Sequence, residues 1–254
     1  MDRSFLSSDQ LIQATRNFVC IRTATYEDKQ EAAFLKWAFV ESTAGQLRNF
    51  GYCLLSPDGK TKLRRSTRGP NFLYANSNAM AADLRLISAR YKGTTTTGTA
   101  NRSVPQMKSV RLGINVASCD GLPSVVVFGT DQAEVDSLNQ KLSAVIWDEQ
   151  LAGKFIYAST TNPVDLKIIS GAVFQSGILI IKPDAFGIKG QLIKTISPEV
   201  TDTQLRQSLL NAANTFTRIS KTHGLHVRNG RQTGTIWKTE VAVPSRRRAP
   251  TRSR

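Results

Sequence analysis

Three cysteines, Cys20, Cys53 and Cys119, are the side chains of this chain with the greatest potential for redox chemistry. They lie far apart in the sequence, and none belongs to a Cys-x-x-Cys pair. This spacing argues against a dithiol redox centre, a disulfide scaffold and a zinc ribbon. Each cysteine lies in or beside an apolar, strand-like run, so we interpret all three as small buried hydrophobic residues.

The other candidates for chemistry are His223 and His226, the only histidines in the chain. Two histidines hold a metal ion only with further ligands, and no cysteine or acidic residue is near them in the sequence. The segment Gly59-Lys60-Thr61 ends like a phosphate-binding loop, but Leu54 stands where such a loop needs glycine. With no Ser-His-Asp arrangement either, we expect no enzymatic activity, no cofactor and no metal, and we identify no small-molecule substrate.

Basic side chains are the one positive signal of function. The chain carries 34 Lys and Arg against 19 Asp and Glu, a formal net charge of +15. Such an excess favours acidic proteins, nucleic acids or anionic membrane surfaces as partners. The candidate partner-binding residues form two clusters, Lys60, Lys62, Arg64, Arg65 and Arg68 on a predicted hairpin, and Arg246, Arg247, Arg248, Arg252 and Arg254 in the tail. The alternatives are an edge strand protected by its charge and a solvated tail.

Trp237 is a further candidate for partner binding. Asn229-Gly230 is typical of a two-residue turn, so we predict an appended hairpin followed by an Arg-rich tail over residues 221–254. Trp and Arg are enriched in binding hot spots, which makes Trp237 a candidate docking residue. Packing of Trp237 against its own domain is the alternative.

The helices and strands that position these residues fall into two groups. A polar segment rich in Thr and Gly, residues 93–106, separates them. That composition predicts a linker between a first domain, residues 1–92, and a second, residues 107–220. No apolar stretch is long enough to span a membrane, and the first residues lack the layout of a signal peptide. The location therefore stays unknown, with the cytoplasm as the default.

Hydrophobic periodicity and turn residues predict the elements of both halves. In the first half they are a helix over 8–17, a strand over 18–24, a helix over 27–39, a hairpin of 51–55 with 61–64, and a helix over 78–91. In the second half they are strands over 110–117 and 124–129, a helix over 132–150, a strand over 155–159, a short helix over 163–174, a hairpin of 177–181 with 191–196, and a helix over 198–217 capped by Ser197.

The two halves follow a similar order, which indicates an internal duplication. The strand at 18–24 corresponds to that at 155–159, and the turn Ser56-Pro57-Asp58 corresponds to Lys182-Pro183-Asp184. The second half resembles the core of the thioredoxin superfamily in its order of elements. In the first half, SSDQLIQATRNFVCIRTATYED and LLSPDGKTKLRR resemble segments of the same core.

The resemblance implies an α/β protein with two thioredoxin-like domains, each a mixed sheet flanked by helices, followed by the hairpin and basic tail. The first domain would lack its first strand. That gap would expose the strand at 18–24, and we expect the strand at 110–117, or a strand of a partner chain, to fill it. The alternative is that the strand at 110–117 extends the sheet of the second domain.

The resemblance also implies where redox chemistry would sit, and there the sequence departs from the superfamily. The turn expected to carry the reactive cysteines, residues 128–134, contains none. The positions of the superfamily's cis-proline, residues 48–50 and 175–177, contain no proline. We therefore predict a non-catalytic binding or structural subunit of a larger assembly whose basic surfaces contact an acidic partner. The alternatives are a nucleic-acid-associated protein held by its Arg-rich tail and a thiol-disulfide oxidoreductase with a degenerate site.

Overall fold

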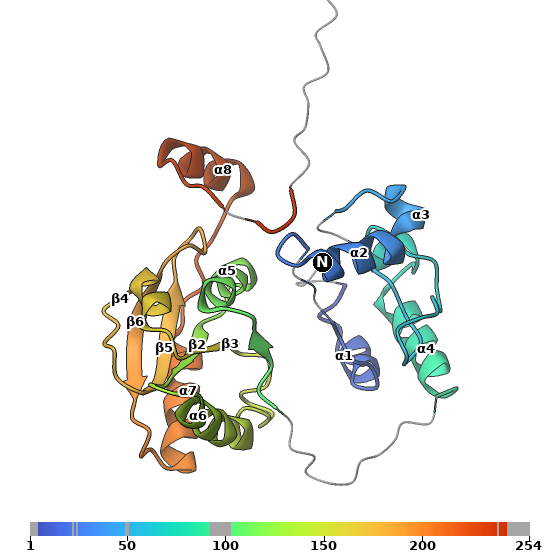
Figure 1. The fold of residues 1–254 in the computed structure, drawn as a ribbon. Helices are drawn as coiled ribbons and strands as arrows, with labels where there is room; N and C mark the ends of the chain where they lie inside the picture. The colour runs from blue at the N-terminus through green and yellow to red at the C-terminus, as the bar shows by residue number, and fades with distance from the viewer. Residues whose placement is uncertain are drawn as a thin grey trace, which may run out of the picture. The chain divides into compact units, whose positions relative to one another are not determined.

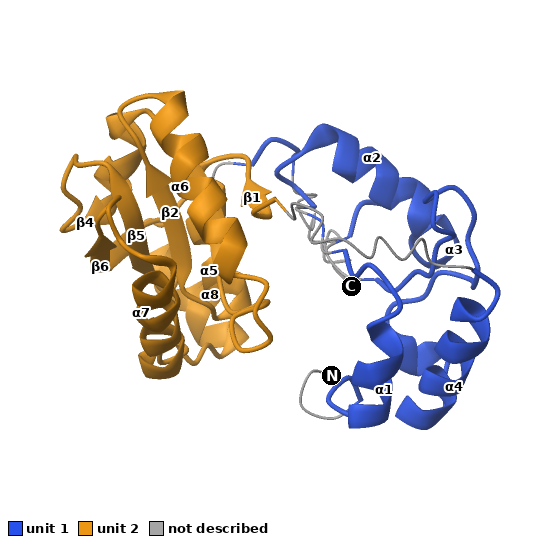
Figure 2. Ribbon diagram, turned by 90° about the horizontal axis from the view of Figure 1, so that it is seen from below, with its two compact units in different colours: residues 1–95, 238–254 blue, residues 96–237 orange. Residues whose placement is uncertain are grey.

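The chain forms two compact units. In the computed structural model the described residues are 5–21, 23, 25–48, 51–91, 103–237 and 239–242. Unit 1 comprises residues 1–95 and 238–254, and unit 2 comprises residues 96–237 (Figure 2). Residues 93–102 of the predicted linker, 93–106, lie outside the described residues, as does the tail from residue 243 onward. The linker and the tail therefore stay predictions.

Unit 2 is built on a six-stranded mixed sheet with the order β1-β3-β2-β5-β6-β4 (Figure 1). Its strands are β1 (Gln106–Met107), β2 (Ser124–Phe128), β3 (Ile156–Thr160), β4 (Ile169–Ser170), β5 (Gly177–Pro183) and β6 (Gly190–Ile196). Strands β1, β3 and β2 are parallel, whereas β5 is antiparallel to both β2 and β6, and β4 is parallel to β6. The α/β class is confirmed, and so are the predicted strands at 124–129 and 155–159 and the hairpin that follows them.

Helices cover both faces of this sheet. They are α5 (Val110–Asp120), α6 (Gln132–Val145), the 3-10 helix η2 (Pro163–Ile168) and α7 (Asp202–Thr215). A further helix, α8 (His223–Gln232), packs against the turn between β5 and β6. Side chains alternate along a strand. Val125 and Val127 of β2 therefore belong to the core formed with α6 and α7, while Val126 belongs to the core formed with α5 and η2. All five residues of β2 are buried, because both faces of the sheet are covered.

Unit 1 is helical around an irregular hairpin. Its helices are α1 (Asp9–Thr15), α2 (Lys29–Ala38), α3 (Val40–Thr43), the 3-10 helix η1 (Pro70–Phe72) and α4 (Ser77–Ser88). Leu11 of α1 packs with Leu84 and Ile87 of α4 in a core that also takes in Leu54. The predicted hairpin forms, but as two isolated antiparallel bridges, Tyr52 with Thr67 and Leu55 with Lys62. Its turn contains Gly59 at φ +72°, a conformation that favours glycine.

The predicted strand at 18–24 is wrong. The described residues of this segment pair with no strand, and Val19 and Ile21 are 89% and 75% exposed. A β-branched run favours an extended chain but supplies no ladder partner. Since no strand of unit 1 is formed in its described residues, the expected correspondence with β3 fails as well.

The predicted strand at 110–117 is also wrong, because this segment is helix α5. Ser109 caps it by accepting a hydrogen bond from the Leu112 amide, and Gly121 ends it at φ +67°. Val110, Ile114 and Ala117 recur at helical spacing and are buried. The segment therefore cannot fill a gap in unit 1. An apolar run of four to eight residues suits a strand as well as a buried helix, which is why its pattern alone misleads.

The predicted hairpin over 221–254 is wrong in its first part, which is helix α8. Gly230 lies inside α8 and is buried, and a Cβ there would meet the rings of Trp237 and Phe186 at 3.1 and 3.3 Å. Glycine is thus used for close packing and not for a turn. Two smaller differences are that the helix predicted over 163–174 is only the short η2, and that Thr201, not Ser197, caps α7.

Candidate functional site

The cations of the predicted basic hairpin are largely engaged within unit 1. Lys62 donates a hydrogen bond of 2.7 Å to Glu41 and lies 5.2 Å from the centroid of the Trp37 ring. Hydrogen bonds from Lys62 and then Ser66 lower the pKa of Glu41 to about 2. The Lys62 side chain is only 16% exposed, so its charge is shared with residues of its own unit.

Arg64 is held by a carboxylate in the same way. Its guanidinium donates to both oxygens of Asp83, with an Nε–Oδ2 distance of 3.0 Å, and the Tyr74 hydroxyl donates to Asp83 at 2.7 Å. Burial opposes ionisation of Asp83, but the hydrogen bonds from Arg64 and Tyr74 outweigh it and lower the pKa of this carboxyl. Such an arrangement stabilises the packing of the hairpin on α4.

The remaining hairpin cations differ in their exposure to partners. Arg65 donates to the Phe72 carbonyl at 3.2 Å, and Arg68 also interacts within the molecule. Lys60 lies on the exposed turn. Four of the five cations of this hairpin therefore have partners within the chain, and the role of the cluster in partner binding stays a prediction. The five arginines of the tail lie outside the described residues, so their binding role stays a prediction.

A carboxylate organises the turn between β2 and α6, where the resemblance would place reactive cysteines. Glu134 accepts hydrogen bonds from the Thr130 amide at 2.7 Å, from the Thr130 hydroxyl at 3.0 Å and from the Ser176 hydroxyl at 2.5 Å. These bonds, that of Ser176 first, lower the pKa of Glu134. Glu134 and Ser176 also line a cavity of about 300 Å³ together with Asp131, Ala133, Ser137, Leu138 and Pro198.

The cysteines are not placed as the sequence predicted. Cys20 and Cys119 are exposed and Cys53 is half-buried, and none of them forms a disulfide. Cys119 belongs to α5 and faces solvent on that helix. Burial raises the pKa of Cys53, which opposes formation of a thiolate there. The expectation that all three are buried hydrophobic residues is therefore wrong for Cys20 and Cys119.

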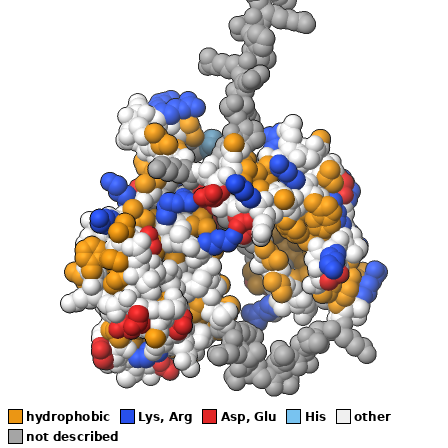
Figure 3. Space-filling model, viewed as in Figure 1, with side chains coloured by type: hydrophobic (Ala, Val, Ile, Leu, Met, Phe, Trp, Pro, Cys, Tyr) orange, Lys and Arg blue, Asp and Glu red, His pale blue; other side chains and the backbone are white. Residues whose placement is uncertain are grey.

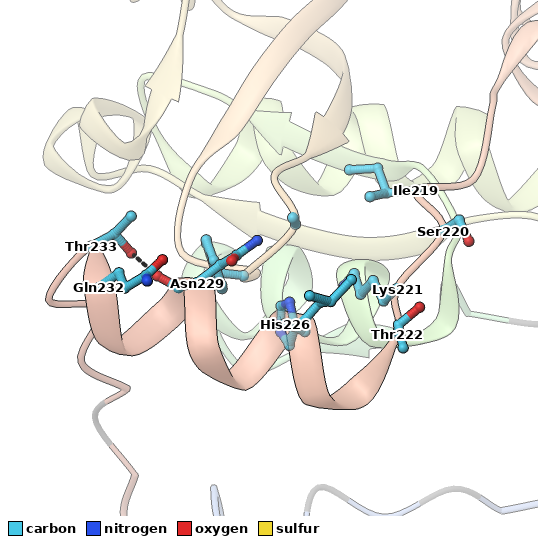
Figure 4. A pocket seen from close by; sticks show the side chains of 11 residues that line it. Ile219, Ser220, Lys221, Thr222, His226, Asn229, Gln232 and Thr233 are labelled. Carbon is cyan, nitrogen blue, oxygen red and sulfur yellow. Dashed lines mark hydrogen bonds between the residues drawn. The ribbon is translucent and has the colours of Figure 1, made fainter.

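A larger cavity runs along α8, and we call it the α8 groove. It has a volume of about 470 Å³. Figure 4 shows side chains of α8 and of the segment before it pointing to the same side of the helix. The groove is lined by Ala185, Phe186, Ile219, Ser220, Lys221, Thr222, Leu225, His226, Asn229, Gln232 and Thr233. Among these described lining residues none is acidic.

Aromatic contacts hold α8 to the turn between β5 and β6. His226 stacks on Phe186 with their ring centroids 4.7 Å apart. The Trp237 indole donates a hydrogen bond of 2.9 Å to the Phe186 carbonyl, and its ring lies edge-on to that of Phe186. Trp237 thus packs against its own unit, the alternative that the sequence left open, and it keeps 44% of its surface exposed.

Basic side chains lie on α8 and in the segment before it. Lys221 donates from Nζ to the Ser118 carbonyl at 2.8 Å and to the Ser118 hydroxyl at 2.7 Å, and burial lowers its pKa. Arg218, Arg228 and Arg231 are exposed, and within the described part of the chain no side-chain hydrogen bond or ion pair engages them. Figure 3 shows basic side chains on the outer side of α8.

Sequence reasoning missed the α8 groove because it treated this segment as a hairpin. One signal could have found it, since residues 203–239 contain several Lys and Arg but no Asp or Glu. Within that stretch Leu225, Asn229 and Gln232 recur at helical spacing. A stretch whose charged residues are all basic, and whose uncharged residues recur at helical spacing, is typical of a helix with one face for binding.

Comparisons with known proteins give no relative: no protein-family model, no curated protein and no solved structure matches this chain. Over the described residues no cluster of His, Cys, Asp and Glu could hold a metal ion. Among the helices that the structure describes, none combines the length and the apolar character needed to cross a membrane.

Proposed function

We propose that this chain is a non-catalytic, thioredoxin-fold binding or structural subunit of a larger assembly, and that it contacts an acidic partner through basic surfaces. The observation that carries the proposal is the pair of sites in unit 2. The turn where thiol chemistry would sit holds Glu134, and the α8 groove combines an apolar lining with basic neighbours.

The topology of unit 2 supports a thioredoxin-like fold. Helices α5 and α6 connect the parallel strands β1, β2 and β3, and the antiparallel hairpin β5–β6 is followed by α7. From β2 to α7 this is the order that the resemblance implies for a complete domain, with β1 and α5 added before it and β4 added at one edge. Unit 1 lends no such support to the tandem arrangement, because its described residues form no sheet.

The chemistry of the β2–α6 turn supports binding over redox catalysis. A nucleophilic thiolate needs a cysteine whose negative charge is stabilised by its surroundings. The turn has no cysteine, and the Glu134 carboxylate would raise the pKa of any thiol placed beside it. The oxidoreductase alternative would have to use an isolated cysteine such as Cys119, without a second thiol near it in the sequence.

The apolar lining of the α8 groove favours a protein partner over nucleic acid. A protein surface that binds single-stranded nucleic acid contacts both phosphates and bases. It therefore combines cations with aromatic rings whose faces are open for stacking. Here His226 and Phe186 stack on each other, which occupies one face of each ring. Nucleic acid remains the second candidate because of the five arginines at 246–254 and the net charge of +15.

Affinity capture of the full chain with and without nuclease treatment tests the proposal. We expect proteins with acidic surfaces to be retained after nuclease digestion, and to be released gradually as salt rises. Loss of all captured material on nuclease digestion, with a steep log-linear dependence on salt, would replace the proposal by the nucleic-acid alternative.

A further inference from the structure

We propose that the α8 groove binds an acidic peptide segment that carries a large apolar side chain. This inference rests on the proposed function and names the surface and the chemistry by which the partner is recognised. The occupant is a segment of a partner protein, because the groove has Lys221 and no acid in its lining, and the chain's own tail, residues 245–254, carries five arginines and no acid.

The size of the groove fits a short extended peptide. Its volume of about 470 Å³ lies within the range of about 300–1,000 Å³ that ligand pockets occupy. The ten residues of α8 extend about 15 Å at about 1.5 Å per residue. An extended peptide advances about 3.3 Å per residue, so the groove accommodates about four to five of its residues.

The lining provides a site for one large apolar side chain. Phe186 comes from the turn between β5 and β6, Ile219 from the segment before α8, and Leu225 from α8 itself. Leu225 is 54% exposed, so an apolar ligand would remove a large part of its surface from water. Asn229 and Gln232 supply amide groups that can pair with the backbone of an extended peptide (Figure 4).

The charges around the groove select an acidic segment. Lys221 lines it directly, while Arg228 follows Leu225 by three residues and precedes Gln232 by four, which places it on the rim beside both. Arg231 comes three residues after Arg228 on the outer side of the same helix. Carboxylates flanking the apolar side chain would meet Lys221 and Arg228, whereas Arg231 adds positive charge on the far side of α8. No acid lies within residues 203–239, and Asp184, before Phe186, is close enough to Lys221 to act on its charge.

A displayed library of short random peptides, panned on the full chain, tests this inference directly and needs no candidate partner. We expect the enriched peptides to contain Asp or Glu beside Phe, Leu or Trp. Synthetic fluorescein-labelled copies of these peptides are then titrated against the variants Leu225→Asp and Arg228→Glu/Arg231→Glu, and their fluorescence anisotropy is measured. Each variant should weaken binding at least tenfold.

The matched control is Lys154→Glu/Lys167→Glu, which makes the same change in charge on exposed residues of unit 2 that do not line the groove. It should change binding less than twofold. An absence of enriched peptides, enrichment without acidic residues, or equal binding by the groove variants would overturn the inference. If the groove variants still capture the acidic partner of the full chain, the groove assignment fails while the proposed function stands. If the peptides bind but no acidic protein is captured, the proposed function fails.

Discussion

At the scale of single residues, Glu134 shows how the β2–α6 turn is organised. Its carboxylate accepts three hydrogen bonds that join the turn to Ser176, forty-two residues further along the chain. Without this acceptor the Thr130 amide would lose its partner at the start of a helix, where amides have no partner within the helix.

Glu134→Ala should therefore speed hydrogen exchange of the Thr130 amide while leaving exchange in the centre of α6 unchanged. Because the pKa of Glu134 is lowered in the folded chain, its stabilising effect is complete above the ordinary pKa near 4.5. The effect is lost as the pH falls through the lowered value. The difference between wild type and variant should shrink on acidification, and a difference that grows instead would contradict the assignment.

Arg64 is the second residue with a clear structural role. Arg64→Ala removes both hydrogen bonds from Arg64 to Asp83 and leaves a largely buried carboxylate that keeps the hydrogen bond from Tyr74 and the more distant charge of Arg90. We expect the opening free energy of α4 to fall by about 1–3 kcal/mol, measured by hydrogen exchange. Lys60→Ala on the same hairpin is the control and should have almost no effect, and equal effects of both changes would show that Arg64 is not a structural cation.

At the scale of elements, α8 depends on the aromatic contacts that hold it. Trp237→Ala removes the hydrogen bond to Phe186 and the ring that packs on Gly230. The opening free energy of α8, measured by hydrogen exchange, should therefore fall by about 1–2 kcal/mol. The neighbouring change Ile236→Ala removes a side chain that is 79% exposed and should not alter exchange. Unchanged exchange in Trp237→Ala would show that α8 is held by other contacts.

The elements that the sequence predicts well are those whose patterns are local. The helix at 132–150 and the hairpin at 177–196 have a sustained period or a Pro-Asp turn, and both form within a few residues of the predicted bounds. The failures at 18–24 and 110–117 are short apolar runs, whose structure is decided by whether a partner strand or a helical core is available. The charge pattern of residues 203–239 could have indicated the helix α8, but the groove itself joins residues 185–186 to 219–233, which come together only through the sheet.

At the scale of the whole molecule, the excess of positive charge is used in two ways. In unit 1 Lys62 and Arg64 are neutralised by Glu41 and Asp83 and hold the hairpin. In unit 2 the arginines of α8 are exposed beside an apolar groove. A net charge of +15 therefore does not by itself identify the binding surface. Of the two described basic surfaces, that of α8 is the better candidate for binding a partner.

Insulin disulfide reduction by dithiothreitol, with and without the full chain, tests most directly whether this fold binds or reacts. The β2–α6 turn has no cysteine and the described cysteines are not paired, so we expect the same rate with the chain as with dithiothreitol alone. Cys119→Ser should behave like the wild type. A faster rate that disappears in Cys119→Ser would contradict the binding role and support an oxidoreductase that uses one isolated thiol.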